Sequence, residues 1–288
     1  MEIGQRLILR SNQADLSLLG NQKMTDPAVL SDAASALRNA SASGTFIAPL
    51  RETYPGLTAA DAYAIQAINT QLKRAAGVRV IGTKIGLTSP AVQQQLGVDQ
   101  PDYGVLFDDM WFPEGLPIPM VALHQPKIEA EVAFVLGRDL DMERPGFAEV
   151  LRAIDYALPA LEIVGSRIAD WNIGLVDTIA DNASSSAFVL GGSPRRLEHL
   201  DLRAARMQMT ADGLGVSQGG GAACLGHPLN AVVWLAQKMA ALGAPLQAGQ
   251  VVLSGALGPM SPVAPGQSFT ARIEGFGPVT AVFAEEAR

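Results

Sequence analysis

Two glutamates separated by a single residue stand in the apolar run Lys127-Ile128-Glu129-Ala130-Glu131-Val132. The run from 128 to 136 predicts a strand, on which residues i and i+2 share a face roughly 6.5 Å apart. Two like charges among apolar neighbours repel each other and lose hydration. A divalent cation relieves both penalties, and all-oxygen ligation suits Mg²⁺, Mn²⁺ or Ca²⁺ better than zinc. The alternative is a solvated strand face that binds no ion.

A third acid, Glu162, is the lone charge in the apolar run 158–164, where a buried carboxylate needs a partner. That partner is either a cation such as Arg167 or Lys84, or a metal ion shared with Glu129 and Glu131. Lys84 is itself the only charge in a small, glycine-flanked strand pattern. It could meet an anionic substrate, transfer a proton after burial lowers its pKa, or form an ion pair with a buried glutamate.

Other candidates have weaker patterns. The segment 98–104 contains Asp99 and Asp102 among turn-forming residues, which by themselves predict a turn. His124 could be a base near the glutamates, although a surface or capping position is more common for such a histidine. The run Ser184-Ser185-Ser186 is typical of a loop that could line a site.

Composition excludes several classes of protein. The 288 residues include 17% charged residues, below the roughly 25% of typical soluble domains, and the net charge is −7. This net negative charge does not favour a basic surface that would bind nucleic acid. The single cysteine, Cys224, excludes internal disulfides and CxxC zinc sites and is expected in the core. No apolar run reaches the roughly 18 residues of a membrane span, and residues 1–23 lack a secretory pattern, so a cytoplasmic location is expected. The low charge suits a homo-oligomer.

Periodicity predicts an α+β protein. Helices are expected at 27–40, 58–76, 89–97, 147–154 and 228–242, and strands at 79–87, 128–136, 157–164, 187–190, 202–210, 251–253, 269–273 and 279–283. The late strands lack helical crossovers, which favours a largely antiparallel or rolled sheet. Residues 1–23 have no clear period and are predicted to be disordered or not native to the protein. Residues 24–288 are predicted to form a single catalytic domain.

Several long segments, in order along the chain, resemble one known family. They are "GTKIGLTSPAVQQQLGVDQPDYGVLFDDM", "QPKIEAEVAFVLGRDL", "ALPALEIVGSRIADWNIGLVDTIADNAS", "CLGHPLNAVVWLAQKMAALG" and "LSGALGPM". These segments are similar to the 2-keto-4-pentenoate (2-hydroxypenta-2,4-dienoate) hydratases of the fumarylacetoacetate hydrolase superfamily. The similarity covers roughly residues 25 to 285.

The resemblance implies a mixed β-roll with flanking helices and a hydro-lyase of aromatic meta-cleavage catabolism. The reaction would add water to 2-hydroxypenta-2,4-dienoate, giving 4-hydroxy-2-oxopentanoate. The family's Mg²⁺ or Mn²⁺ ligands match Glu129, Glu131 and Glu162, and its proposed proton-transfer residues match Lys84 and Asp102. The Ser254-Gly255 turn would hold the substrate carboxylate, at a place where family members often carry Thr.

Three alternatives share features with this interpretation. A 4-oxalocrotonate decarboxylase would have the same fold and metal site, but the segment 97–104 and Ala130 are more similar to hydratases. A C–C hydrolase of the superfamily would need a His-Glu pair, and His124 is the only histidine near the metal strand. A non-catalytic partner subunit would not need an intact acid triad. A complex with a pathway decarboxylase or aldolase is compatible with every one of these interpretations.

Overall fold

The computed structural model describes residues 25–89, 93–94, 98 and 100–285. The N-terminal segment 1–23, predicted to be disordered or non-native, lies outside the described residues. Most of the helix predicted for 89–97 lies outside them as well. Within the described ranges, no helix is both long and apolar enough to cross a membrane.

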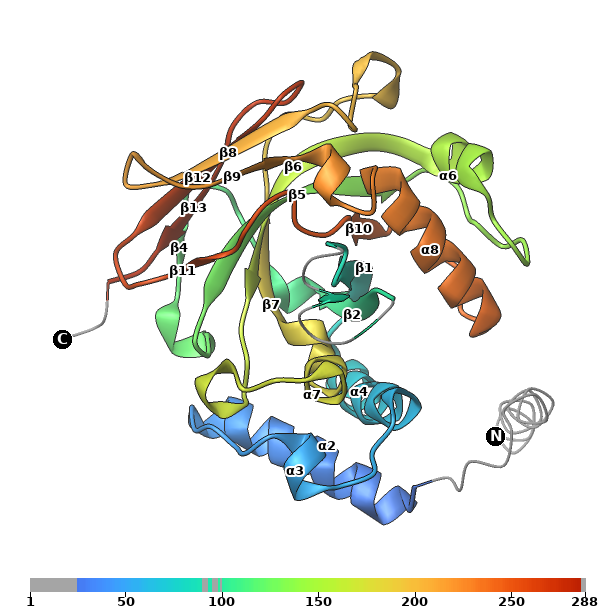
Figure 1. Cartoon of the computed structure of the whole chain (residues 1–288), viewed down its shortest axis with the longest axis vertical. Coiled ribbons are helices and arrows are strands. Elements are labelled where there is room, and N and C mark those ends of the chain that lie inside the picture. Colours follow the sequence, from blue (N-terminus) through green and yellow to red (C-terminus); the bar gives the residue numbers. More distant parts are fainter. Residues whose placement is uncertain (1–24, 90–92, 95–97, 99, 286–288) are drawn as a thin grey trace.

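The larger sheet has eight strands and carries the acidic residues. Its order is β2-β1-β10-β5-β6-β7-β3, and β11 pairs with β5 (Figure 1). The strands are β1 (Val80–Gly86), β2 (Asp102–Phe107), β3 (Trp111–Phe112), β5 (Lys127–Leu136), β6 (Ile154–Val164), β7 (Ser185–Leu190), β10 (Val251–Leu253) and β11 (Ser261–Pro262). β1 is parallel to β10 and antiparallel to β2, so the sheet is mixed.

A five-stranded sheet packs against the larger one. Its order is β4-β13-β12-β8-β9, with strands β4 (Pro117–Ile118), β8 (Arg206–Ala211), β9 (Leu214–Gly220), β12 (Ser268–Ile273) and β13 (Val279–Phe283). Side chains of β8 and β12 alternate between buried and exposed positions because successive strand residues point to opposite faces. Phe134 of β5 and Phe269 and Phe283 of the smaller sheet are fully buried in one hydrophobic cluster. The core therefore lies between the two sheets.

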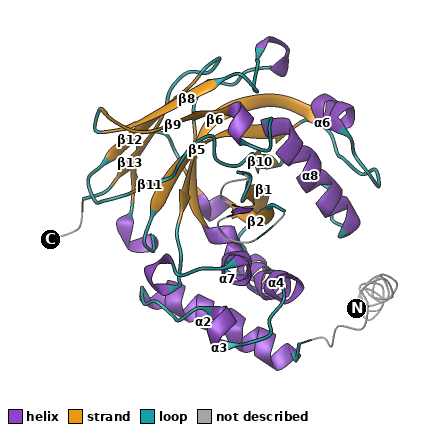
Figure 2. Ribbon diagram, viewed as in Figure 1, coloured by secondary structure: helices purple, strands orange, loops and turns teal. Residues whose placement is uncertain are grey.

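The helices lie in two groups outside the sheets (Figure 2). One group consists of α2 (Pro27–Ser43), α3 (Leu50–Thr53), α4 (Ala59–Ala75) and α7 (Leu175–Ala180), and the other of α6 (Phe147–Ala153) and α8 (Pro228–Ala241). The short 3-10 helices are η1 (Asp108–Met110), η2 (Met120–Ala122), η3 (Ala169–Trp171), η4 (Asn182–Ser184), η5 (Leu197–His199) and η6 (Gly221–Ala223). α4 starts at a capping box in which the Thr58 and Asp61 side chains each bond the other's backbone N–H. This start was predicted from the spacing of the two residues.

The predicted α+β class and rolled, mixed sheet are confirmed. The turn predicted around Asp102 is wrong at that residue. Asp102 begins β2 and pairs with Gly86 of β1. The turn-forming residues before it indicate a chain reversal, but the pairing with β1 involves residues far away in the sequence. A local pattern could not show where that pairing begins.

Candidate active site

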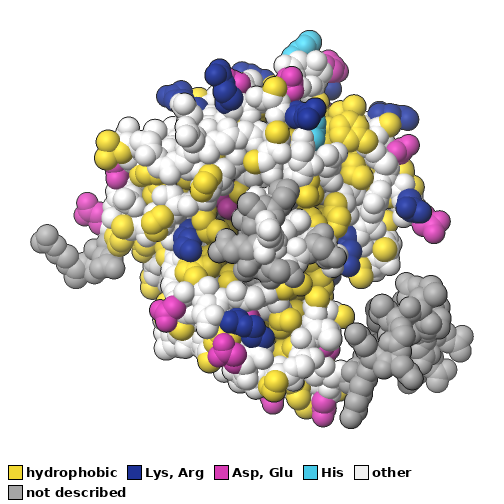
Figure 3. All heavy atoms as spheres, viewed as in Figure 1, with side chains coloured by type: hydrophobic (Ala, Val, Ile, Leu, Met, Phe, Trp, Pro, Cys, Tyr) yellow, Lys and Arg dark blue, Asp and Glu magenta, His cyan; other side chains and the backbone are white. Residues whose placement is uncertain are grey.

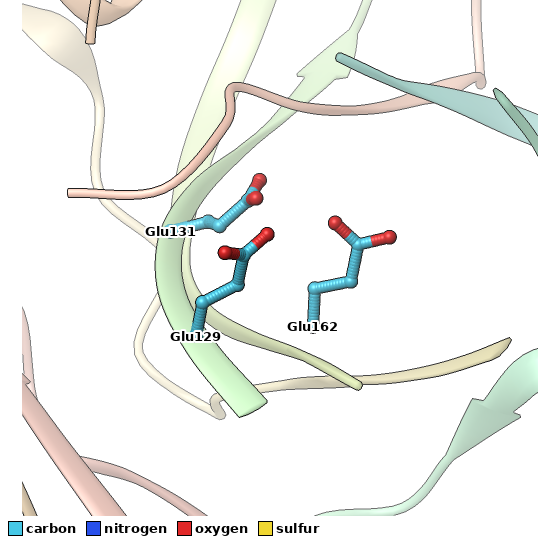
Figure 4. A group of neighbouring side chains, drawn as sticks. All are labelled: Glu129, Glu131 and Glu162. Atoms are coloured by element: carbon cyan, nitrogen blue, oxygen red, sulfur yellow. The ribbon is translucent and has the colours of Figure 1, made fainter. Parts of the chain in front are cut away.

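Three glutamates from two adjacent strands converge at one place. Glu129 and Glu131 lie on one face of β5, and Glu162 pairs directly with Glu129 across the β5–β6 ladder. One carboxylate oxygen from each residue lies within 4.8 Å of the others. Figure 4 shows the three side chains pointing toward a common centre. The structure thus brings together the three residues that the sequence nominated as metal ligands.

Each of the two most buried acids has one oxygen held by the protein and one left free. The Gly255 N–H donates to Glu131 Oε2 at 2.8 Å, and the Ser185 hydroxyl donates to Glu162 Oε1 at 2.7 Å. Glu131 Oε1 and Glu162 Oε2 are buried and accept no hydrogen bond from the described residues. A buried carboxylate oxygen without a donor is unfavourable. These two oxygens fit a divalent cation, which prefers oxygen ligands, and Glu162 Oε2 also lies 3.4 Å from the Lys84 ammonium group.

The charges within the triad disfavour three ionised carboxylates. Although Glu129 is partly exposed to the cavity, burial and the charge of Glu162 raise its pKa to about 7, against the pull of Lys84. Burial and the charges of Glu162 and Glu129 raise the pKa of Glu131 well above its ordinary value. A bound cation would stabilise the ionised forms and so reverse both shifts.

Lys84 lies beside the triad on β1. Its Nζ is 3.4 Å from Glu162 Oε2 and donates a hydrogen bond to the Ala183 carbonyl at 3.0 Å. Burial alone would lower the pKa of Lys84, as the sequence led us to expect. The surrounding carboxylates, Glu162 and Asp102 foremost, outweigh burial and raise it. Lys84 is therefore a buried ammonium group, able to stabilise an anion or donate a proton.

Asp102 is the fourth acid at the site. It is 1% exposed, and its Oδ2 accepts a long hydrogen bond of 3.5 Å from the Thr178 hydroxyl. Burial raises its pKa, while Lys84 lowers it less than burial raises it. A carboxyl group with a raised pKa and an ammonium group side by side can exchange protons with a ligand.

Gly86 makes room for this pair. A Cβ at Gly86 would lie 2.2 Å from Asp102 Oδ1 and 3.3 Å from Lys84 Nζ. The missing side chain therefore lets both groups approach the same point. The sequence showed Gly86 only as a flank of the strand, because the closeness of Asp102 depends on the β1–β2 register.

A cavity of about 340 Å³ opens onto these residues. Its lining includes Lys84, Asp102 and Glu129, together with the hydroxyl groups of Thr178 and Ser184. The lining also includes Lys127 and the apolar side chains of Leu87, Val164, Trp171, Ile173, Ala256 and Met260. A wider and more open hollow of about 430 Å³, between Asp155 and Arg196, contains none of the buried acids. The enclosed cavity is therefore the candidate site.

The turn η4 was predicted in part: the serine run that starts at Ser184 was expected as a loop that could line a site, and Ser184 does line the cavity. Asn182, Ala183 and Ser184 all have positive φ (56°, 50° and 58°), which is rare for three successive non-glycine residues. The Asn182 side chain accepts from the Val105 N–H at 2.7 Å and donates to the Val105 carbonyl at 2.9 Å. These bonds hold the turn on β2 and point the Ala183 carbonyl at Lys84. The local signals were Asn182, a residue type that tolerates this backbone, and the serine run that begins at Ser184.

The Ser254-Gly255 turn lies behind the triad. Ser254 is fully buried, and its hydroxyl accepts from the Val132 N–H at 3.3 Å and donates to the Gly255 carbonyl at 3.1 Å. Gly255 has φ +100°, and its N–H is the donor to Glu131. The turn thus orients a candidate metal ligand. Its contact with the substrate carboxylate stays a prediction.

Two other sequence candidates lie outside the cavity lining. His124 is 4% exposed and meets the ring of Phe46 edge-on at 6.2 Å, so its predicted surface position is wrong, while the capping alternative stays a prediction. A role as base beside the glutamates is not supported by this location. Cys224 is a core residue, as predicted. Burial raises the pKa of its thiol to about 12, so it is a poor nucleophile.

Comparison with known proteins identifies the family. The family described as "Fumarylacetoacetate (FAA) hydrolase C-terminal" matches residues 80–284. A 2-keto-4-pentenoate hydratase of Paraburkholderia xenovorans is 60% identical over 252 residues, 88% of this chain and 94% of that protein. A 2-keto-4-pentenoate hydratase of Burkholderia vietnamiensis is 55% identical over 91% of this chain and 100% of its own length. This chain belongs to the 2-keto-4-pentenoate hydratase family.

A solved structure of an enzyme with a different activity has the same fold as this chain. The 4-oxalocrotonate decarboxylase of Pseudomonas putida G7, complexed with magnesium and adipate, superposes with a TM-score of 0.87. It is 38% identical and covers 91% of this chain and 100% of its own. The fold therefore supports more than one reaction, and side chains in the site must select among them.

Proposed function

We propose that this chain catalyses the metal-dependent hydration of 2-hydroxypenta-2,4-dienoate to 4-hydroxy-2-oxopentanoate in aromatic meta-cleavage catabolism. One observation carries the proposal: a glutamate triad that could hold a metal ion lies beside the Lys84–Asp102 pair, and Glu129, Lys84 and Asp102 line one cavity. The 60% identity to a named hydratase supports this reaction over others that use the same fold.

We assign the metal site to Glu129, Glu131 and Glu162, with Mg²⁺ or Mn²⁺ as the ion. The all-carboxylate donor set and the magnesium bound by the decarboxylase of the same fold support this assignment. A bound divalent cation would supply Lewis-acid polarisation of the 2-oxo group and charge neutralisation. Gly255 and Ser185 hold the second oxygens of Glu131 and Glu162, which fixes both carboxylates for that purpose.

We assign proton transfer jointly to Lys84 and Asp102. The substrate dienol must become a 2-oxo-3-enoate before C4 accepts water, which requires loss of the 2-hydroxyl proton and gain of a proton at C5. Water addition then delivers hydroxide to C4 and a proton to C3. Asp102, with its raised pKa, can hold or release a proton at Oδ1, the atom that accepts no hydrogen bond from the described residues. The Lys84 ammonium group can stabilise negative charge at the same point or donate there.

The test is the decay of the ultraviolet absorbance of 2-hydroxypenta-2,4-dienoate with Mg²⁺ or Mn²⁺ and again with EDTA, with product mass measured. The expected result is metal-dependent decay with a gain of one water. Glu129→Gln is expected to abolish turnover with the fold intact, while the exposed Glu198→Gln serves as the matched control. CO₂ release from 2-oxohex-3-enedioate without hydration of the dienoate would instead assign the chain as a 4-oxalocrotonate decarboxylase. No turnover of either substrate would favour a non-catalytic partner subunit.

We also propose that the protein works as a cytoplasmic homo-oligomer. The low charge content and exposed apolar side chains such as Val121 (92% exposed) and Leu214 (75% exposed) support this. In the view of Figure 3, basic and acidic groups are scattered among apolar side chains rather than gathered into one charged patch. Light scattering would give the subunit number, and co-elution with a pathway decarboxylase or aldolase would test the heteromeric complex.

A further inference from the structure

Lys127 lies at the outer end of the same strand face that carries two triad glutamates. Because strand residues alternate, Lys127, Glu129 and Glu131 of β5 project to one side. Lys127 and Glu129 both line the cavity. The Lys127 ammonium group lies over the ring of Trp171, 4.2 Å from its centroid. Among the described residues, no carboxylate lies within ion-pair distance of it.

Trp171 is held in place at the cavity wall. Its indole N–H donates to the Gln125 carbonyl at 2.9 Å. Trp171 and the preceding Asp170 have φ of 53° and 58°, a left-handed backbone that non-glycine residues seldom adopt. Such conformations persist only where the surrounding structure enforces them, and they cluster at ligand sites. The ring is therefore a fixed platform, and the flexible lysine stem rests on it.

The charge balance of the site indicates a role for the Lys127 ammonium group. Four carboxylates, those of Asp102, Glu129, Glu131 and Glu162, face one buried ammonium group, that of Lys84. When all four acids are ionised, a divalent cation in the triad still leaves one net negative charge, which repels an incoming carboxylate. Lys127 is the other cation among the lining residues that the structure describes, and it brings the balance to neutrality before the substrate enters.

We propose that Lys127, held on Trp171, binds the C1 carboxylate of the substrate at the cavity mouth. This inference rests on the proposed function, since it names the group that recognises the substrate of that site. A C1 carboxylate has two oxygens, and Lys127 takes the one that faces outward, away from the triad. Trp171 is a positioning residue, because its ring keeps the ammonium group from folding back onto Glu129, its nearest acid along the strand face.

The test compares Lys127→Met, which keeps an apolar stem and removes the charge, with Lys127→Arg. We expect Lys127→Met to weaken binding of 2-oxopentanoate, measured by calorimetry with saturating Mg²⁺, roughly 10-fold to 100-fold, the cost of a lost charged hydrogen bond. KM for the dienoate is expected to rise in parallel, with kcat little changed. Lys127→Arg is expected to retain most of the affinity. Lys73→Met is the matched control, because Lys73 also lies over an aromatic ring, that of Phe107 at 4.4 Å, but outside the cavity lining.

Two further ligands separate the possible roles of Lys127. Butane-2,3-dione, which has the two adjacent oxygens but no carboxylate, is expected to bind equally to wild type and Lys127→Met. If Lys127→Met binds 2-oxopentanoate as wild type does, the inference is wrong. If Lys127→Met loses affinity only for 2-oxohexanedioate, then Lys127 binds the distal carboxylate of that ligand, and the inference is also wrong.

The binding measurement needs no turnover, so the inference and the proposed function can fail separately. A wild type that binds 2-oxopentanoate through Lys127 but does not hydrate the dienoate contradicts the function alone. A wild type that hydrates the dienoate while Lys127→Met binds normally contradicts the inference alone. Mn²⁺ affinity, measured by electron paramagnetic resonance, is expected to be undiminished in Lys127→Met. A loss of Mn²⁺ binding would contradict a role directed at the substrate.

Discussion

A methyl group at Gly86 is expected to inactivate the site while leaving the fold intact. Gly86 has no left-handed φ, so alanine can adopt its backbone. The added Cβ, however, would lie 2.2 Å from Asp102 Oδ1 and 3.3 Å from Asp102 Cγ. Ordinary carbon–oxygen contacts are about 3.3 Å or longer, so the Asp102 carboxylate must move by about 1 Å. Asp102 is buried at the start of β2, so this movement changes its placement relative to Lys84.

The expected loss follows from that displacement. A misplacement of about 1 Å in a reacting group can lower the rate about 100-fold, which corresponds to about 2.7 kcal/mol of activation free energy. We therefore expect kcat/KM of Gly86→Ala for 2-hydroxypenta-2,4-dienoate to fall about 100-fold at saturating Mg²⁺. Mn²⁺ affinity is expected to stay near that of wild type, because no triad atom is among the three nearest contacts of the added methyl. Gly215→Ala is the matched control, since its Cβ would meet nothing within 4 Å.

Combining Gly86→Ala with Asp102→Ala tests whether the added methyl group acts through the Asp102 carboxylate. In Asp102→Ala there is no carboxylate to displace, so adding Gly86→Ala is expected to cost nothing more. Full activity of Gly86→Ala would refute the reasoning. An additional large loss in the Asp102→Ala background would refute it as well, because the methyl would then be acting on another group.

The remaining predictions concern the triad, Lys84 and the turn η4. In metal-free protein the pKa of Glu129 is raised to about 7, so the stability that its protonation contributes is complete below about pH 4.5 and is lost as pH rises through 7. Tm in EDTA is therefore expected to fall between pH 5.5 and 8, with the largest rescue by Mg²⁺ at pH 8; a flat profile would contradict the pKa shift. Lys84→Met is expected to lower kcat at least 100-fold without weakening Mn²⁺ binding, because it removes a cation beside the ion site. Asn182→Ala, which removes the two bonds to Val105, is expected to lower kcat about 10-fold and shift the pH profile, whereas a loss of Tm alone would make Asn182 purely structural. Ser254→Ala is expected to raise KM if the turn touches the substrate, and to change only Mn²⁺ affinity if it acts through Glu131.

The members of the glutamate triad were predictable because each stands out within its own segment. Glu129 and Glu131 share a face by strand periodicity alone, and Glu162 stood out as a single acid in an apolar strand. The Lys84 contact with Ala183 joins residues 99 positions apart, and the Thr178 contact with Asp102 spans 76. No pattern within one segment contains such pairings. The resemblance to a known family nominated Lys84 and Asp102, while the structure placed them side by side.

The roles of Gly86 and of the Ala183 carbonyl were missed for a different reason. Gly86 matters for the side chain that it lacks, and Ala183 matters through its carbonyl, so neither residue type signals its own role. Their effects come from the β1–β2 register and from the bonds between Asn182 and Val105. Backbone positions of this kind are found from a fold and not from a list of reactive side chains.

Lys84 interacts with both the glutamate triad and Asp102. Its ammonium group lies 3.4 Å from Glu162 Oε2, one of the two free oxygens that fit a cation, and the charge of Asp102 also raises its pKa. Any cation that takes Glu162 Oε2 competes with Lys84 for that oxygen. Lys84 is then left with the Ala183 carbonyl and Asp102 as partners, and the Glu162 contribution to its raised pKa is weakened. If the triad holds a cation as proposed, the Lys84–Asp102 pair would be freer to exchange protons, which is the role that we assign to it in the hydration reaction.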